Sequence, residues 1–189
     1  MDRAKIEEGV RLLLEGIGED PARDGLVDTP RRVADMYGEI ISTDPDDLSS
    51  IVAPIGSDTH QEMVLVRDIT FHSLCEHHLT PFFGVAHVAY IPSKNGNITG
   101  VSKIVRLVRT AAARLQLQER LTSAIADTLV VSLQPAGVLV LIQAEHLCMT
   151  MRGVRAPGSR VVTSAVRGIF QTSAATRAEV LALIEAPNG

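Results

Sequence analysis

Two short segments of the chain combine residue types that bind metal ions and transfer protons. Segments 75–78 and 146–148 hold both cysteines and three of the six histidines. Cys75 and His78 are three residues apart, so one tight turn can direct both side chains to the same point, and Cys148 could supply a third ligand. Two thiolates and one imidazole leave one position of a tetrahedral zinc ion open, which distinguishes a hydrolytic zinc from a structural one. The pattern therefore indicates Zn²⁺ with water in the open position.

Three other interpretations of these residues remain open. Either thiol could be a small buried apolar side chain, since free cysteine is often buried. His77 or His146 could complete a structural zinc site with four protein ligands. Cys75 and Cys148 could also form a disulfide, but the first residues carry no secretory signal and cytoplasmic proteins rarely keep disulfides. We therefore expect a cytoplasmic protein with reduced thiols.

The composition indicates a globular chain with a sizeable core. The chain has 189 residues, 46% of them hydrophobic, and no apolar run reaches membrane-spanning length. Its net charge is −4, whereas nucleic-acid-binding proteins usually carry a basic surplus. With no Trp and 3% aromatic residues, it also has few rings on which bases could stack. We expect neither a nucleic-acid nor a membrane partner, and an anionic ligand would need cations gathered locally.

The first 50 residues are predicted to form a helical region. Apolar residues recur at helical spacing over residues 2–17. Thr29 suits the N-cap of a second helix and Pro30 its first turn. A polar stretch at residues 42–50 then separates this region from the rest of the chain. We therefore divide the chain into an N-terminal helical region, 1–50, and a single domain, 51–189, that carries the candidate site.

The order of predicted elements after residue 50 is that of an α+β domain. Residues 63–71 and 85–91 are rich in β-branched and aromatic residues, which predicts two strands with the candidate zinc turn between them. Apolar residues then repeat at intervals of three and four over 104–115 and over 121–133, which predicts two adjacent helices. Residues 138–149 read as a long apolar strand, and a further strand and a last helix follow.

Alternation along the predicted strand at 138–149 has a chemical consequence. It puts His146 and Cys148 on the same face. If Cys148 binds a metal ion, His146 is close enough to transfer protons without being a ligand, and His77 stands in the same relation to His78. Imidazoles titrate near neutral pH, and zinc lowers the pKa of its water into the same range. Two such histidines would supply the acid and the base for a multistep hydrolysis.

Five motifs follow one another along the chain. They are Asp-Thr-Pro-x-Arg-Val at 28–33, Cys-Glu-His-His-Leu-x-Pro-Phe-x-Gly at 75–84, Gly-Val-Ser-Lys-Ile at 100–104, Gln-Glu-Arg-Leu-Thr at 118–122 and His-x-Cys-Met-x-Met-Arg-Gly at 146–153. Together they resemble the GTP cyclohydrolase I family, over nearly the whole chain. Val85 and Gln143 depart from the family pattern, but neither is a candidate ligand or catalytic residue.

The resemblance implies a fold, an assembly and a reaction. The fold would be the tunnelling fold, in which an antiparallel four-stranded sheet carries two helices on one face, here with an N-terminal helical extension. The assembly would be a homodecamer of two pentamers with active sites at subunit junctions. The reaction would convert GTP and water to 7,8-dihydroneopterin triphosphate and formate, the first step of tetrahydrofolate and pterin biosynthesis.

The resemblance also implies roles for the residues around the metal. The zinc ligands would be Cys75, His78 and Cys148, which leaves His77 and His146 as the catalytic histidines. Ser102 would assist near the ribose.

Substrate binding needs one acceptor for guanine and several cations for the triphosphate. Guanine presents two adjacent donors, and one carboxylate can accept both. The resemblance implies that Glu119 has this role and that Gln118 beside it also binds the substrate. Alone, Glu119 would read as a solvated residue favoured by the helix dipole. The phosphate-binding positions would be Lys103, Arg106, Arg152 and Arg32. A competing interpretation is a zinc-stabilised oligomer that binds a purine nucleotide without turnover.

Overall fold

The computed structural model describes residues 1–41, 48–55, 61–94 and 97–187, which divide into two compact units, Met1–Pro45 and Asp46–Gly189. The first unit contains two packed helices, α1 (Arg3–Gly16) and α2 (Thr29–Ile40). The side chain of Asp2 caps α1 by accepting from the backbone N–H of Lys5. Thr29 was predicted as the N-cap of α2, but Asp28 occupies that position and Thr29 is the first helical residue. Pro30 fits there because its missing N–H has no partner in a first turn.

Residues 42–47 of the predicted polar separator lie outside the described residues. The end of that stretch is helical, because α3 (Leu48–Ile51) begins there. Within the described part of the chain, the helices are too short or too polar to cross a membrane.

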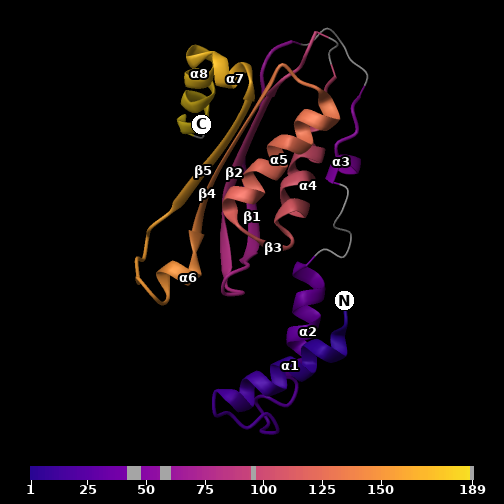
Figure 1. Ribbon diagram of the computed structural model, residues 1–189, viewed down its shortest axis with the longest axis vertical. Helices are drawn as coiled ribbons and strands as arrows, with labels where there is room; N and C mark the ends of the chain where they lie inside the picture. Colours follow the sequence, from indigo (N-terminus) through magenta and orange to yellow (C-terminus); the bar gives the residue numbers. More distant parts are fainter. Residues whose placement is uncertain (42–47, 56–60, 95–96, 188–189) are drawn as a thin grey trace. The chain divides into compact units, whose positions relative to one another are not determined.

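One sheet organises the second unit (Figure 1). Its long strands are β1 (Val64–Cys75), β2 (Pro81–Ile91), β4 (Gly137–His146) and β5 (Val161–Gly168), and neighbours among them pair antiparallel. The two-residue strand β3 (Leu115–Gln116) pairs in parallel with the end of β1, which gives the order β3-β1-β2-β4-β5. The expected antiparallel four-stranded sheet is therefore a mixed five-stranded sheet. The α+β class is confirmed.

The two predicted central helices are α4 (Val101–Ala112) and α5 (Gln118–Leu133), and both cover the same face of the sheet (Figure 1). Their apolar rows are buried against inward-facing residues of β1, β2 and β4. The predicted first repeat extends to Leu115, but the helix ends at Ala112 and Leu115 joins β3. Burial of these rows removes apolar surface from water and so fixes the helices on the sheet.

A smaller apolar cluster lies on the other side of β4. Leu139 packs there with Ala89, Phe170 and Val180, the last two from α7 (Ile169–Thr172) and α8 (Ala174–Glu185). Val138, Val140, Ile142 and Ala144 instead join the main core. The predicted alternation thus holds to the end of β4, but the strand ends at His146. Cys148 lies on the short helix α6 (Leu147–Thr150) rather than on the predicted strand.

Candidate metal centre and active-site pocket

The turn between β1 and β2 directs Cys75 and His78 to one side. Its backbone is closed by hydrogen bonds from Leu79 N to Cys75 O at 2.8 Å and from Cys75 N to Thr80 O at 2.9 Å. Leu79 has a φ of 54°, the left-handed conformation that allows the chain to reverse here. Cys75 and His78 therefore converge, although Cys75 is the last residue of β1 and His78 lies in the turn that follows it.

Cys148 reaches the same point from α6. The donor atoms of Cys75, His78 and Cys148 all lie within 4.8 Å of one another, and neither cysteine forms a disulfide. Cys75 is buried, Cys148 is half-buried and His78 is exposed. The three predicted ligands are thus brought together in an arrangement that could hold a metal ion.

The electrostatics of the two thiols fit a cation. Burial raises the pKa of the Cys148 thiol, and the nearby Cys75 raises it further. Two adjacent thiolates repel each other in a partly desolvated site, so a cation between them would stabilise both. Two sulfur donors and one imidazole nitrogen are ligands that Zn²⁺ prefers. The donor set therefore fits zinc chemically.

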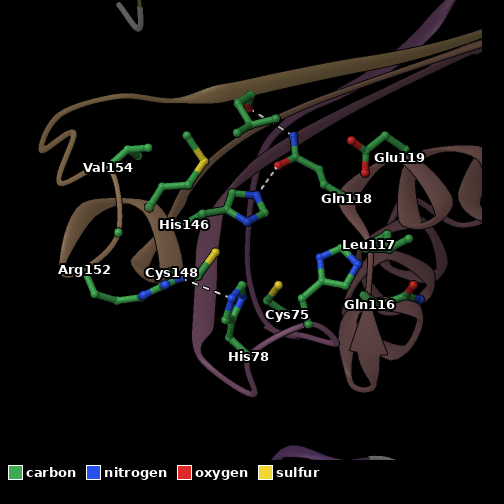
Figure 2. A pocket seen from close by; sticks show the side chains of 14 residues that line it. Cys75, His78, Gln116, Leu117, Gln118, Glu119, His146, Cys148, Arg152 and Val154 are labelled. Carbon is green, nitrogen blue, oxygen red and sulfur yellow. Dashed lines mark hydrogen bonds between the residues drawn. The ribbon is translucent and has the colours of Figure 1, made fainter.

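His146 stands at the last position of β4, above the metal-binding group (Figure 2). Its Nε2 lies 2.8 Å from Oε1 of Gln118. Its ring stacks on Phe82, with centroids 4.5 Å apart and planes inclined by 6°. Burial lowers the pKa of His146, and the charge of Glu119 opposes that shift. The imidazole is therefore held between two neighbours and favoured in its neutral form.

A pocket of about 500 Å³ opens in front of these groups (Figure 2). His77, His146 and Glu119 line it together with the three candidate ligands. Arg152 also lines it, and its Nη1 lies 3.1 Å from Nε2 of His78. Because arginine only donates, His78 Nε2 is the acceptor of that bond. Acid–base groups, a carboxylate and a guanidinium thus share one cavity with the metal-binding group.

The remaining predicted site residues lie outside this pocket. Ser102, Lys103 and Arg106 stand at the N-terminal end of α4 and are not among the residues that line the described pocket. The C-terminal end of α4 leads into β3, which pairs with Cys75. Ser102 lies about 15 Å along the helix axis from that end. Arg32 belongs to the first unit, where it donates to Asp28 at 3.2 Å.

Two neighbours of the site were missed from the sequence. Phe82 is the cross-strand partner of His146, a relation that required knowledge of the strand register. Arg120 forms an ion pair with Glu76 and donates to Leu115 O at 3.1 Å and to Gln116 Oε1 at 3.0 Å. It therefore ties the metal-binding turn to β3. The motif around each residue was visible, but its contacts were not.

Known proteins resemble this chain over nearly its whole length. The family model described as GTP cyclohydrolase I matches residues 6–185. The chain is 58% identical over 183 residues to GTP cyclohydrolase 1 of Geobacillus kaustophilus (strain HTA426), which covers 97% of each chain. It is 60% identical over 184 residues to GTP cyclohydrolase 1 of Carboxydothermus hydrogenoformans (strain ATCC BAA-161 / DSM 6008 / Z-2901), covering 97% of this chain and 95% of the relative. It is 57% identical over 181 residues to GTP cyclohydrolase 1 of Bacillus subtilis (strain 168), covering 96% and 95%.

Proposed function

We propose that this chain, which belongs to the GTP cyclohydrolase I family, converts GTP and water to 7,8-dihydroneopterin triphosphate and formate. One observation carries the proposal: a metal-binding group of two thiols and an imidazole faces the same pocket as two further histidines and a carboxylate. The product would enter tetrahydrofolate or another pterin pathway. We assign the protein to the cytoplasm, where its thiols would stay reduced.

We infer that the metal is zinc, held by Cys75, His78 and Cys148. When bound, zinc would supply Lewis-acid activation of water for attack on C8 of the purine. In the described part of the chain, these three residues are the group of Cys, His, Asp and Glu donors close enough to share an ion. A set of three protein ligands supports a catalytic site with one open position, because a structural zinc site normally has four protein ligands.

His146 and His77 are proposed to move the protons of the reaction. Burial keeps the pKa of His146 below its usual value, so near neutral pH this imidazole is free to accept a proton. His77 lines the pocket from the turn on the other side. Opening the imidazole ring of guanine and releasing C8 as formate each require a proton to be taken and given. Two histidines within one pocket suit those steps.

Glu119 is proposed to bind guanine. It stands in the first turn of α5 and is exposed to the pocket. Its carboxylate can accept from the N1 hydrogen and the 2-amino group together, as a fork. Arg152, on the opposite wall beside His78, would then be available to the phosphate chain.

The active site is proposed to be shared between subunits. Ser102, Lys103 and Arg106 would contact the ribose and phosphates, but they lie about 9–15 Å along the helix from the end of α4 that leads to their own pocket. A neighbouring copy could present the same end of its α4 to this pocket, and Arg32 of the proposed N-terminal region 1–50 would add another cation. The assembly we propose is the homodecamer of two pentamers, with the tunnelling fold, that the family implies.

The proposed reaction is tested by incubating the zinc-loaded protein with GTP. Pterin fluorescence after oxidation and formate release are measured together, with a chelator-treated control. Equal yields of both products, abolished by the chelator, are expected. Formate without pterin would contradict the ring-closing half of the reaction. Neither product from folded protein that binds GTP would favour a nucleotide-binding protein without turnover.

A further inference from the structure

We propose that Gln118 fixes the tautomer of His146, so that the neutral imidazole carries its proton on Nε2 and presents Nδ1 to the pocket as the proton acceptor. The inference deepens the proposed function, because it assigns Gln118 as a positioning residue for one of the two histidines. It rests on the direction of each hydrogen bond in a buried network around the Gln118 side chain.

The amide nitrogen of Gln118 is surrounded by hydrogen-bond acceptors. Nε2 lies 3.2 Å from Ile142 O, 3.0 Å from Val161 O and 3.1 Å from Thr163 Oγ1. The first two are backbone carbonyls, which can only accept. The amide must therefore turn its NH₂ group towards them, and this orientation follows from its partners rather than from the appearance of the amide itself.

The third neighbour is an acceptor as well. Thr122 donates its hydroxyl hydrogen to Gln118 O at 2.7 Å. The hydroxyls of Thr122 and Thr163 are 2.6 Å apart, so Thr163 must be the donor in that pair. With its only hydrogen used, Thr163 Oγ1 can only accept from Gln118. A flipped amide would thus place its oxygen against three acceptors in a buried site, at the cost of several hydrogen bonds.

The orientation of Gln118 then determines that of His146. Gln118 Oε1 can only accept, and it lies 2.8 Å from Nε2 of His146. His146 Nε2 must therefore be the donor. In a neutral imidazole the proton on one nitrogen leaves the other with a free lone pair. Figure 2 shows the opposite side of the ring turned towards Cys148, so that lone pair faces the candidate metal centre.

Phe82 holds the plane of the imidazole ring. Phe82 lies parallel to it with centroids 4.5 Å apart, and Phe82 is itself fully buried. Gln118 is 1% exposed and both of its N–H groups are used inside the protein. The side chain is therefore placed to act through His146, and contact with guanine is left to Glu119 on the next position of α5.

The test uses the zinc-loaded protein labelled with ¹⁵N in histidine and examined by magic-angle-spinning NMR. The shift of an imidazole nitrogen distinguishes a protonated from a bare atom, and the His146 signals are assigned by their loss in His146→Asn. A proton on Nε2 and a bare Nδ1 are expected in the unsubstituted protein. A proton on Nδ1 would overturn the inference, whether or not the protein turns over GTP.

Two substitutions of Gln118 separate orientation from mere packing. Gln118→Met removes the acceptor and should give a mixture of tautomers. Gln118→Glu, as the neutral acid, can donate its O–H to the carbonyls that now bind the amide and turn its other oxygen to His146, so it should retain the proton on Nε2. The control is Thr99→Val, which removes another buried donor, the hydroxyl that bonds Ala53 O beside Tyr90, at the opposite end of β2 from Phe82; its His146 signals should not change. An unchanged tautomer in Gln118→Met would overturn the inference.

Kinetics distinguish a positioning role from substrate binding. Gln118→Met should lower kcat by about 10²-fold, the lower range for acid–base catalysis, with KM for GTP unchanged. A rise in KM at constant kcat would show that Gln118 binds substrate and would overturn the assignment. Failure of the unsubstituted protein to form pterin would sink the proposed function, whereas the NMR result tests the tautomer independently.

Discussion

Phe82 and His146 are directly opposite each other on β2 and β4, and their rings stack with planes only 6° apart. One face of the imidazole is thereby covered by a residue that is itself fully buried. The stack holds the ring at the angle at which one nitrogen meets Gln118 and the other meets the pocket. Placement of this histidine is thus a property of the strand register as much as of the histidine itself.

Phe82→Leu should therefore impair catalysis beyond its effect on stability. We expect kcat to fall about tenfold, because the imidazole is no longer held flat, and the free energy of unfolding to fall by about 1–3 kcal/mol. The matched control is Phe71→Leu, since Phe71 is also buried and its ring meets Phe82 edge-on, at a centroid distance of 6.0 Å. Equal losses of kcat in both variants would contradict the positioning role of the stack.

His77→Ala should separate metal binding from catalysis. His77 lies outside the group of three donors, so zinc content measured by atomic mass spectrometry should stay at the unsubstituted level. Turnover should fall by about 10²- to 10⁴-fold, the range for loss of an acid–base group. Cys148→Ser is the comparison and should lose the metal. Loss of zinc from His77→Ala would make His77 a structural ligand instead.

Arg120 should strengthen metal binding without touching the metal. Its guanidinium joins Glu76 of the turn to Leu115 and Gln116 of β3. Arg120→Lys cannot make all of these bonds, and we expect zinc affinity to fall about tenfold, the lower range for a supporting contact. Arg109→Lys, an exposed position on α4, is the control for the charge-preserving change. Unaltered affinity in Arg120→Lys would show that the turn holds its shape alone.

His87 should make stability depend on pH, far from the catalytic chemistry. Burial lowers the pKa of His87 from 6.5; the charge of Asp68 opposes this shift and the charge of Arg67 adds to it. The Nδ1 atom of His87 accepts a hydrogen bond from the backbone N–H of Asp68 at 3.3 Å. The unfolded chain binds the His87 proton more readily than the folded chain does. The contribution of neutral His87 to the free energy of unfolding is therefore full above pH 6.5, and it is lost as the pH falls from there towards the pKa of the folded state. Denaturant unfolding should show a stability loss in that window that shrinks in His87→Asn. An identical pH dependence in the variant would refute this assignment.

The elements that position the site were predictable where one periodicity extended over many residues. The apolar pattern of the sequence predicts which residues of α4 and α5 are buried. It also predicts the alternation of buried residues along β4 up to Ala144, because each of these elements buries one continuous face. The α+β class followed from that order. The convergence of Cys75 and His78 was also predictable, because it depends on a spacing of three residues.

The remaining details depend on contacts that a pattern does not encode. β4 ends at His146 although the apolar run continues, since the next four residues form α6 and bring Cys148 to the turn. β3 is two residues long, too short to show a period. Thr163, on the edge strand β5, reaches Gln118 45 residues away, and nothing around Thr163 in the sequence signals that bond. Tertiary pairing determined each of these features.

Zinc titration of metal-free protein, with formate release as the readout, shows whether the proposed metal ion is needed for catalysis. If Cys75, His78 and Cys148 hold the catalytic metal, activity should rise linearly with added zinc and stop rising at one ion for each chain. The same titration of Cys148→Ser should stay flat. Full formate release by the metal-free protein, or activity restored to Cys148→Ser at the same zinc level, would contradict the account.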